Sequence, residues 1–172
     1  TNLVNLTSQL SQSWNPAGSG NYSVQVTTAG SGGSVYASKH AAFEEMVNAM
    51  ADICNEVANE KIETPFAAQD PNLEESPFSF NSIADFTNNI RSVQNAYLGK
   101  YSTDGKGLED IVRANNLSLD GNIKTKINAA IASLNAITVP FGQVIISQQV
   151  QVTNAQNAIN SLKDVIENDL MT

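Results

Sequence analysis

Residues 74–97 read EESPFSFNSIADFTNNIRSVQNAY and join a turn-rich polar entry to a helix with two different faces. Pro77 keeps the chain before the helix extended. Ser79, Asn81 and Ser82 can each accept a hydrogen bond from the free N–H groups of a helix start, so we expect a helix from about Ser82. Its apolar residues recur at spacings of three and four, at Ile83, Phe86, Ile90, Val93 and Tyr97. This spacing places them on one face and predicts a core-facing stripe.

The opposite side of the same helix carries polar residues at the same spacing, at Asn81, Asp85, Asn88, Ser92 and Asn95. Arg91 lies on the flank of this polar stripe. Only Asp85 in the stripe is charged, whereas a helix face that meets only water normally carries more Lys and Glu. We therefore expect the polar stripe to meet another piece of protein or a ligand.

The composition limits the class of protein. With 172 residues, of which 41% are hydrophobic, the chain is long enough to bury a core. A formal charge of −8 argues against nucleic acid or an anionic membrane surface as a partner, because both need clustered Lys and Arg. The single cysteine, Cys54, excludes an internal disulfide and is expected to pack as a small apolar residue. No apolar run approaches the roughly 20 residues of a transmembrane helix, and no signal peptide opens the chain.

The first residues already show helical periodicity, with Leu3, Leu6, Leu10 and Trp14 on one side. We expect a helix over residues 1–14 and a Gly- and Ser-rich loop over residues 15–35. The main bundle is expected over residues 36–171, with the whole of 1–172 forming one domain. Because the chain starts with Thr1 and is helical from its first turn, we expect it to be the later part of a longer precursor.

The remainder of the chain contains further amphipathic segments. One runs from about residue 38 to residue 62, and we expect Pro65 to end it. Residues 63–78 contain three prolines and read as a long irregular connection into the helix that starts near Ser82.

Beyond Gly99 the pattern predicts a short helix over Leu108–Arg113. A long helix is expected from an N-cap at Ser118 to Pro140, and a last one after Gly142. Four long helices with short or medium links predict an all-α fold, an antiparallel up-and-down four-helix bundle with extra short helices.

The sequence offers few metal ligands. His40 and Glu44 are four residues apart and could bind one ion, but two ligands do not make a site, and a solvated helix pair is the more common arrangement. Glu74, Glu75 and Asp85 lie around one helix entry and could offer oxygen ligands to a hard cation or to iron. The alternative is that Glu74 and Glu75 are solvated and complement the helix dipole. The metal ligands therefore stay unassigned.

No catalytic residue is assigned from the sequence. Ser76 and Ser79 lack a recognisable base or nucleophile motif, so we expect them to cap and position the chain.

Several short motifs in the second half of the chain resemble the second-half signature of the imelysin-like family. They are Glu75–Ser82 (ESPFSFNS), Asp85–Phe86, Asn88–Asn89, Tyr97–Gly99, Asn55–Ile62 (NEVANEKI), Gly107–Val112 (GLEDIV) and Pro140–Phe141. The resemblance covers about residues 36–170. It implies an extracytoplasmic bacterial protein associated with iron uptake, either periplasmic or attached to the outer membrane, with a lipid anchor expected on the missing N-terminal part. It also implies two helical bundles, of which this chain is one.

The family's GxHxxE motif is absent from this chain. That motif underlies the family's peptidase label and its proposed metal site, and it belongs to the first half. His40 does not replace it, because no glycine precedes it at the right spacing and its acidic partners fall at four and five residues instead of three. The resemblance therefore implies a first-half bundle as partner, either a separate chain or part of a precursor.

We accordingly predict a metal- or ligand-binding module whose site is shared with the first-half bundle. The candidate ligand-binding residues are Glu75, Ser76, Ser79, Asn81, Asp85, Asn88 and Arg91. The resemblance suggests iron or another divalent metal as cofactor, although this chain alone supports none. Two alternatives stay open. One is a metallopeptidase of the imelysin type, which needs a metal, an activated water and a base in one cleft. The other is a structural interaction domain.

Overall fold

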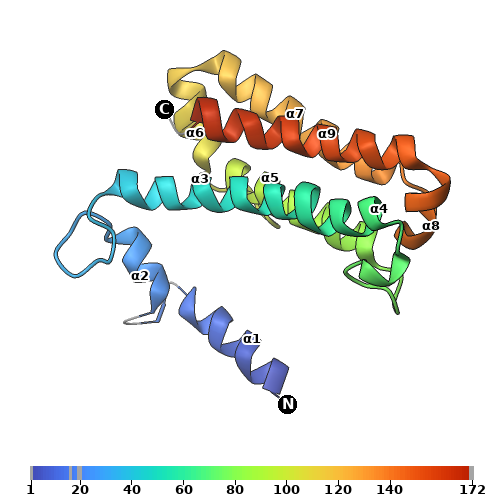
Figure 1. Cartoon of the computed structure of the whole chain (residues 1–172). Helices are drawn as coiled ribbons and strands as arrows, with labels where there is room; N and C mark the ends of the chain where they lie inside the picture. The colour runs from blue at the N-terminus through green and yellow to red at the C-terminus, as the bar shows by residue number, and fades with distance from the viewer. Residues whose placement is uncertain (1, 16, 19–20, 171–172) are drawn as a thin grey trace. The chain divides into compact units, whose positions relative to one another are not determined.

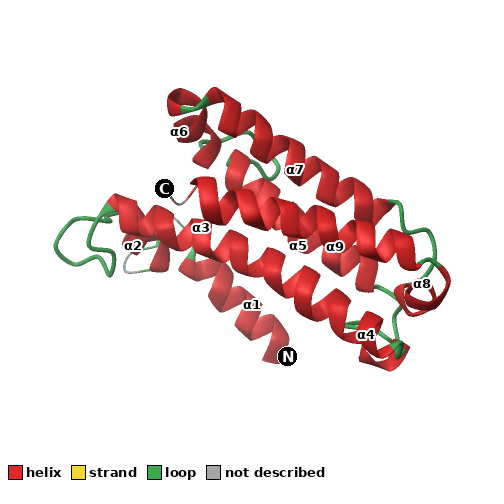
Figure 2. Ribbon diagram, turned by 45° about the horizontal axis from the view of Figure 1, so that its top comes forward, coloured by secondary structure: helices red, strands yellow, loops and turns green. Residues whose placement is uncertain are grey.

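A computed structural model describes residues 2–15, 17–18 and 21–170 of the chain. Within these ranges every regular element is a helix (Figure 2), which confirms the all-α prediction. The expected start at Thr1 lies outside the described residues. The chain divides into two compact units, residues 1–46 and residues 47–172. The boundary falls inside one continuous helix, α3 (Lys39–Glu56), so the expectation of a single domain stays a prediction.

The first unit begins with α1 (Asn2–Ser13), which confirms the helix expected over residues 1–14. After it comes α2 (Tyr22–Thr27), so the prediction of an irregular loop over residues 15–35 is wrong for these residues.

Contacts from outside the segment explain why α2 is helical. The Tyr22 and Tyr36 hydroxyl oxygens lie 2.6 Å apart, and the Ser34 hydroxyl donates to the carbonyl oxygen of Gln25 at 2.6 Å. These tertiary bonds outweigh the strand preference of the alternating Val and Thr residues, which is weak and depends on context.

Among the described residues, the second unit is an antiparallel bundle of four long helices (Figure 1). They are the second part of α3, α5 (Ser82–Leu98), α7 (Leu117–Asn135) and α9 (Gln149–Val165). α7 packs against both α5 and α9, and α9 also packs against the helical segment that continues α3. Successive helices run in opposite directions, which confirms the predicted up-and-down bundle. No described helix is long and apolar enough to cross a membrane.

The core of the bundle follows the stripe predicted on α5. Its fully buried members are Phe86, Ile90, Val93 and Tyr97, while Ile83 is half-buried. Burying each of the larger side chains contributes about 1.5–3 kcal/mol. Phe86 meets Phe141 edge to face, with 5.2 Å between the ring centroids. Cys54 is also buried, and burial raises the pKa of its thiol to about 12, so it packs as the neutral, apolar residue predicted.

The helix that begins with α3 does not end at Pro65, as the sequence predicted. It continues through a π-helical segment, Val57–Ile62, into α4 (Glu63–Ala68). Pro65 lies in the first turn of α4, directly after the π-helical segment, and the first turn is where a helix tolerates proline best. The chain leaves the helix at Gln69, which adopts a left-handed conformation with φ 53°.

Two other helix boundaries differ from the prediction. α7 starts two residues earlier than expected, because the Asn116 side chain, rather than Ser118, accepts a hydrogen bond from the backbone of Leu119 at 3.0 Å. The last helix is two helices, α8 (Phe141–Ser147) and α9, which meet at Gln148.

The break at Gln148 has a tertiary cause. The amide group of Gln69 donates to the carbonyl oxygen of Ile145 at 2.9 Å and so satisfies a backbone group at the end of α8. No Gly or Pro marks this position, so sequence alone gives no signal for it.

Two glycines let the chain cross itself between α5 and α6 (Leu108–Asn115). Gly99 ends α5 in a left-handed conformation with φ 63°, and Gly107 precedes α6. A Cβ atom on Gly99 would overlap the backbone of Lys106 and Gly107, and one on Gly107 would overlap the backbone of Leu98 and Gly99. This close approach holds α6, which confirms the short helix predicted there, against α5 and α7.

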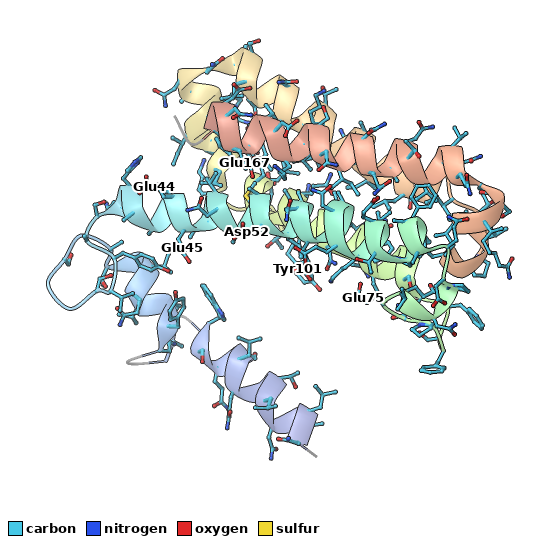
Figure 3. The ribbon with its side chains drawn as sticks, viewed as in Figure 1. Glu44, Glu45, Asp52, Glu75, Tyr101 and Glu167 are labelled. Carbon is cyan, nitrogen blue, oxygen red and sulfur yellow. The ribbon has the colours of Figure 1, made fainter. Side chains whose placement is uncertain are left out.

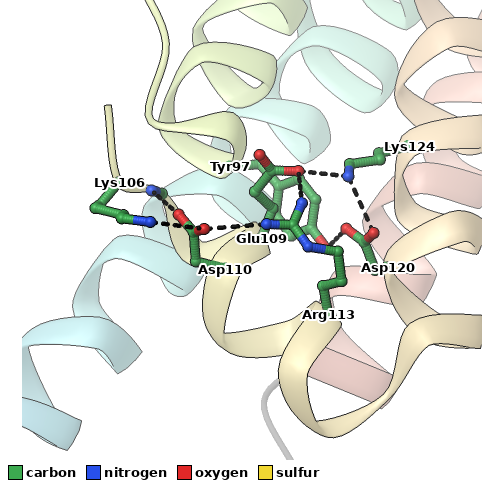
Figure 4. A network of polar contacts seen from close by, with 8 residues as sticks. Tyr97, Lys106, Glu109, Asp110, Arg113, Asp120 and Lys124 are labelled. Carbon is green, nitrogen blue, oxygen red and sulfur yellow. Dashed lines mark hydrogen bonds and ion pairs between the residues drawn. The ribbon is translucent and has the colours of Figure 1, made fainter. Parts of the chain in front are cut away.

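A network of charged and hydroxyl groups joins α5, α6 and α7 beside this crossing (Figure 4). The Tyr97 hydroxyl donates to Asp120 Oδ1 at 3.0 Å, and both side chains are buried. Lys124 Nζ lies 3.0 Å from Asp120 Oδ2 and also pairs with Glu109. Arg113 binds the same Glu109 carboxylate at 3.1 Å. Each charge therefore has an opposite partner, which is the condition for burying such groups at low cost.

Candidate functional site

The loop before α5 is anchored by a buried serine. The Ser82 hydroxyl donates to Glu74 Oε2 at 2.6 Å and accepts the backbone N–H of Ser76 at 3.1 Å. Ser82 is fully buried and Glu74 is only 6% exposed. Gly142 leaves room for this carboxylate, because a Cβ there would come within 2.8 Å of Glu74 Oε1. Glu74 is thus a structural residue of the loop, and the alternative of a solvated side chain is wrong for it.

A second set of hydrogen bonds fixes the carboxylate of Asp85 in the first turn of α5. The Ser76 hydroxyl donates to Asp85 Oδ2 at 2.7 Å, and the Asn81 amide donates to Asp85 Oδ1 at 2.7 Å. Asn81 occupies the N-cap position, but its side chain bonds Asp85 instead of capping the helix. The three residues, called the Asp85 cluster below, hold a negative charge where the helix dipole favours it.

The carboxylate of Glu75, labelled in Figure 3, turns to a different partner. Lys61 Nζ lies 3.0 Å from Glu75 Oε1 and 3.0 Å from Glu56 Oε1. Glu56 and Lys61 are five residues apart. Their side chains lie on one face of the helix only because the intervening turn is π-helical. Partial burial lowers the pKa of Lys61, but the hydrogen bonds to Glu75 and Glu56 outweigh it and leave the pKa raised.

The remaining predicted site residues stay apart from this cluster. Ser79, Asn88 and Arg91 are exposed, and within the described chain none of them bonds to the Asp85 cluster. Among the described residues, Arg91 forms no ion pair with Asp85, whose partners are Ser76 and Asn81. Asn88 follows Asp85 by three residues and precedes Arg91 by three, so they extend the same surface of α5. Of the seven predicted residues, the structure joins Ser76, Asn81 and Asp85 directly.

Exposed aromatic rings flank the Asp85 cluster. The Phe78 side chain is 97% exposed and that of Phe80 is 65% exposed. Phe80 has φ 54°, a left-handed conformation that costs a non-glycine residue about 1–2 kcal/mol. Its backbone N–H donates to the carbonyl oxygen of Ser76 at 3.0 Å, which fixes the turn. The same hydrogen-bonded loop that orients Asp85 therefore presents two rings to the surface.

No described part of the chain gathers three His, Cys, Asp or Glu side chains in a metal-binding arrangement. The acidic set considered from the sequence is dispersed, since Glu74 binds Ser82, Glu75 binds Lys61, and Asp85 binds two neutral donors. His40 and Glu44 form an exposed helix pair at 3.4 Å. The oxygen atoms of the Asp85 cluster suit a hard cation, but an ion there would need ligands from outside this chain.

Sequence reasoning missed two residues that build this region. The sequence gives no signal for the contact of Lys61 with Glu75, because the π-helical segment that aims Lys61 at Glu75 has no simple signature. Ser82 was expected to be a helix cap, whereas it lies inside the fold. The signal for Ser82 was available, because Ser82 falls in the same turn as Phe86 on the core side of the helix.

Replacing Ser82 by alanine is expected to lower the free energy of unfolding by about 2 kcal/mol, because the buried Glu74 carboxylate loses its hydrogen-bond donor. Urea unfolding followed by circular dichroism measures this change. Ser79→Ala, in the same loop but exposed, is the matched control and should change stability by less than about 0.5 kcal/mol. Equal stability of the two variants would contradict the anchoring role of Ser82.

A family model described as Imelysin matches residues 1–168. The chain belongs to the imelysin family. This confirms the resemblance first seen in the motifs of residues 36–170, and the match also includes the first unit.

Similar proteins are about twice as long as this imelysin chain. Iron-regulated protein A of Synechococcus elongatus is 31% identical over 155 residues, which are 87% of this chain and 43% of that protein. A crystal structure of an imelysin peptidase from Bacteroides ovatus is 31% identical, with a TM-score of 0.79, and the match covers 95% of this chain and 49% of that one. A structure described as an iron-regulated protein A precursor from Parabacteroides distasonis is 28% identical, with a TM-score of 0.80 over 94% and 50% of the two chains. We call the part of these relatives that the chain does not match the companion half.

Proposed function

We propose that this imelysin chain supplies one wall of a ligand-binding site that the companion half completes, in a protein that takes part in bacterial iron uptake. The Asp85 cluster carries the proposal. Ser76 and Asn81 orient a carboxylate at the surface, next to an exposed polar face of α5. Two of the similar proteins are named for regulation by iron, which supports iron as the element concerned.

The chemistry of the Asp85 cluster favours a shared site. Asp85 carries the only carboxylate in the cluster. The amide nitrogen of Asn81 donates to Asp85, so the amide oxygen of Asn81 is left as a second hard oxygen ligand for a metal ion. Hard cations take about six oxygen ligands. Because the described residues hold no set of three metal-binding side chains, most ligands would come from the companion half or from a chelator.

Arg91 adds an anion-binding group to the same surface. Its side chain is exposed and has no ion-pair partner among the described residues. A free guanidinium binds carboxylates in a bidentate manner. A ferric ion carried by a carboxylate-bearing chelator would match Arg91 and Asp85 together, with Asn88 between them on the helix.

The location proposed for the protein is outside the cytoplasm, at the periplasm or the outer membrane. The description of the Parabacteroides distasonis relative as a precursor supports this location. A lipid anchor would then belong to the companion half.

Iron binding can be tested in a two-half chimera, in which this chain replaces the matching half of the Bacteroides ovatus protein. Binding is measured by calorimetry with ferrous ion and with ferric citrate. The dissociation constant of Asp85→Asn is expected to be at least about tenfold higher than that of the unchanged chimera, as for loss of a metal ligand or of a residue that supports one. The Asn side chain keeps the shape of Asp85 but removes its charge.

Asp52→Asn is the matched control, because Asp52 is an exposed acidic residue on α3 (Figure 3). It should bind iron as the unchanged chimera does. Equal affinity in the Asp85 and Asp52 variants would remove Asp85 from the site and favour the remaining class, a structural interaction domain.

A peptidase activity is not proposed for this chain. The name of the Bacteroides ovatus relative refers to that protein. A metal-dependent peptidase centre needs about three protein ligands and a bound water, and the described residues do not bring such a set together.

A further inference from the structure

The first helix carries an apolar stripe that the rest of the first unit leaves largely exposed. No residue of α1 is buried. The stripe consists of Leu3, Leu6, Leu10 and, just after the helix, Trp14, with 73%, 55%, 62% and 50% of their surface exposed. The Trp14 ring also meets the Tyr22 ring edge to face, with 5.2 Å between the ring centroids. Isolated exposed leucines are ordinary, but a continuous row of four large side chains on one helix face marks an interaction surface.

α1 has little to stabilise it by itself. It has 12 residues, and helices of this length are marginal in water even when alanine-rich. Its sequence, NLVNLTSQLSQS, contains no charged residue, so it has no ion pairs along the helix and no acidic or basic groups to complement the dipole. Asn, Ser and Thr lower its intrinsic propensity further. Its helical state therefore depends on burying the stripe.

The family match nevertheless includes α1. The family model covers residues 1–168 and so includes all of α1. The two solved structures match 95% and 94% of this chain but only about half of their own length. The relatives thus contain as much chain again, and α1 has an apolar face that its own unit does not cover.

We infer that α1 packs through its stripe into an apolar groove of the companion half, so that this chain contributes a helix to the neighbouring bundle. The chemistry of α1 fits a protein groove better than a membrane. Interfacial helices rely on Lys and Arg at anionic headgroups, α1 has neither, and the whole chain carries −8. The uncharged polar face of Ser, Asn and Gln is compatible with further burial.

This contact is separate from the Asp85 cluster. The α1 contact and the proposed ligand-binding site have in common only that both need the companion half. Either proposal can therefore be wrong while the other holds. Asp85→Asn should leave the α1 contact unchanged, whereas disrupting the stripe should not change the hydrogen bonds around Asp85.

Hydrogen exchange measured by mass spectrometry tests the inference. In the 172-residue chain alone, α1 amides are expected to exchange within about tenfold of an unstructured peptide. In the two-half chimera they should be protected at least about 100-fold more, since the stripe is then buried and the linkage gives a high effective concentration. Leu6→Glu combined with Leu10→Glu should abolish this protection.

The control pair is Ser8→Glu combined with Gln12→Glu. It introduces the same two charges at the same spacing of four, but on the opposite side of α1. The control should keep the protection of the unchanged chimera, which separates loss of the apolar contact from a general effect of charge on the helix.

Several outcomes would overturn the inference. If α1 is protected in the chain alone and light scattering shows a monomer, α1 packs on its own bundle. If this protection rises as the chain dimerises, α1 packs on a second copy. Protection that appears only with phosphatidylglycerol vesicles would indicate a lipid surface. A chimera whose α1 exchanges as fast as in the chain alone, or whose two charge pairs behave alike, would equally rule out the groove.

Discussion

Replacing Gly107 by alanine is expected to lower the free energy of unfolding by about 4 kcal/mol, the largest single effect in this chain. The added Cβ would overlap the backbone of Leu98 and Gly99, and backbone atoms cannot move aside as a side-chain end can. Relief requires separating α6 from α5. That separation also loosens Glu109 and Arg113, which lie on α6.

Gly99→Ala should be similarly damaging, because steric overlap adds to the cost of a left-handed conformation. Urea unfolding measures both variants. Gly121→Ala is the control, since a Cβ at Gly121 meets no atom within 4 Å and the residue lies inside α7. It should stabilise the protein by about 0.5–1 kcal/mol. A Gly107 variant as stable as the Gly121 variant would show that the two backbone segments do not touch.

The second large effect is expected at Asp120. Asp120→Ala should cost about 3 kcal/mol, because the buried Tyr97 hydroxyl loses its acceptor and Lys124 loses one of its two carboxylates. Tyr97→Phe removes the donor instead and leaves Asp120 paired with Lys124, so it should cost only about 1 kcal/mol. Lys106→Met, at an exposed end of the same network, is the control and should be nearly neutral.

The Tyr97 and Asp120 pair also predicts alkaline sensitivity. Burial first, and the hydrogen bond to Asp120 second, raise the pKa of Tyr97 above its usual value near 10. A group with a raised folded-state pKa contributes its full stability below the unfolded pKa and loses it as pH rises toward the folded pKa. Stability should therefore fall from about pH 10 upward, and the fall should be shallower in Tyr97→Phe. Equal slopes for both proteins in urea titrations at several pH values would contradict this.

The parts of the fold that the sequence predicted are those encoded locally. α5 could be placed to within about a residue because Pro77 and Gly99 limit it and its apolar spacing is regular. The helices of the bundle followed from the same periodicity, and their short links made antiparallel packing the simplest arrangement.

The parts that the sequence did not predict depend on distant contacts. α2 exists beside Tyr36 and Ser34, and α8 ends where Gln69 reaches Ile145. Neither contact has a local signature. The helix continues past Pro65 because Pro65 lies in the first turn of α4, where proline is tolerated. That turn counts as a first turn only because the π-helical segment precedes it.

The candidate site could be predicted in part for the same reason. Ser76, Asn81 and Asp85 are close in sequence, so their positions around one helix start were readable from the pattern. Lys61 reaches Glu75 from another helix, which no spacing rule indicates. Whether the seven predicted residues bind a ligand stays a prediction.

The number of residues in the π-helical segment Val57–Ile62 decides whether the helix is regular at this point. A π turn holds one residue more than an α turn, so a deletion of one residue there would leave a regular α-helix. The residues after the deletion would keep their helix faces, because the turn loses only the residue that it holds in excess. Glu56 and Lys61 would then be four residues apart, a spacing that still brings them together on an α-helix, but Pro65 would fall within an uninterrupted helix. Shortening this segment would therefore be costly because of Pro65 and not because of the ion pair.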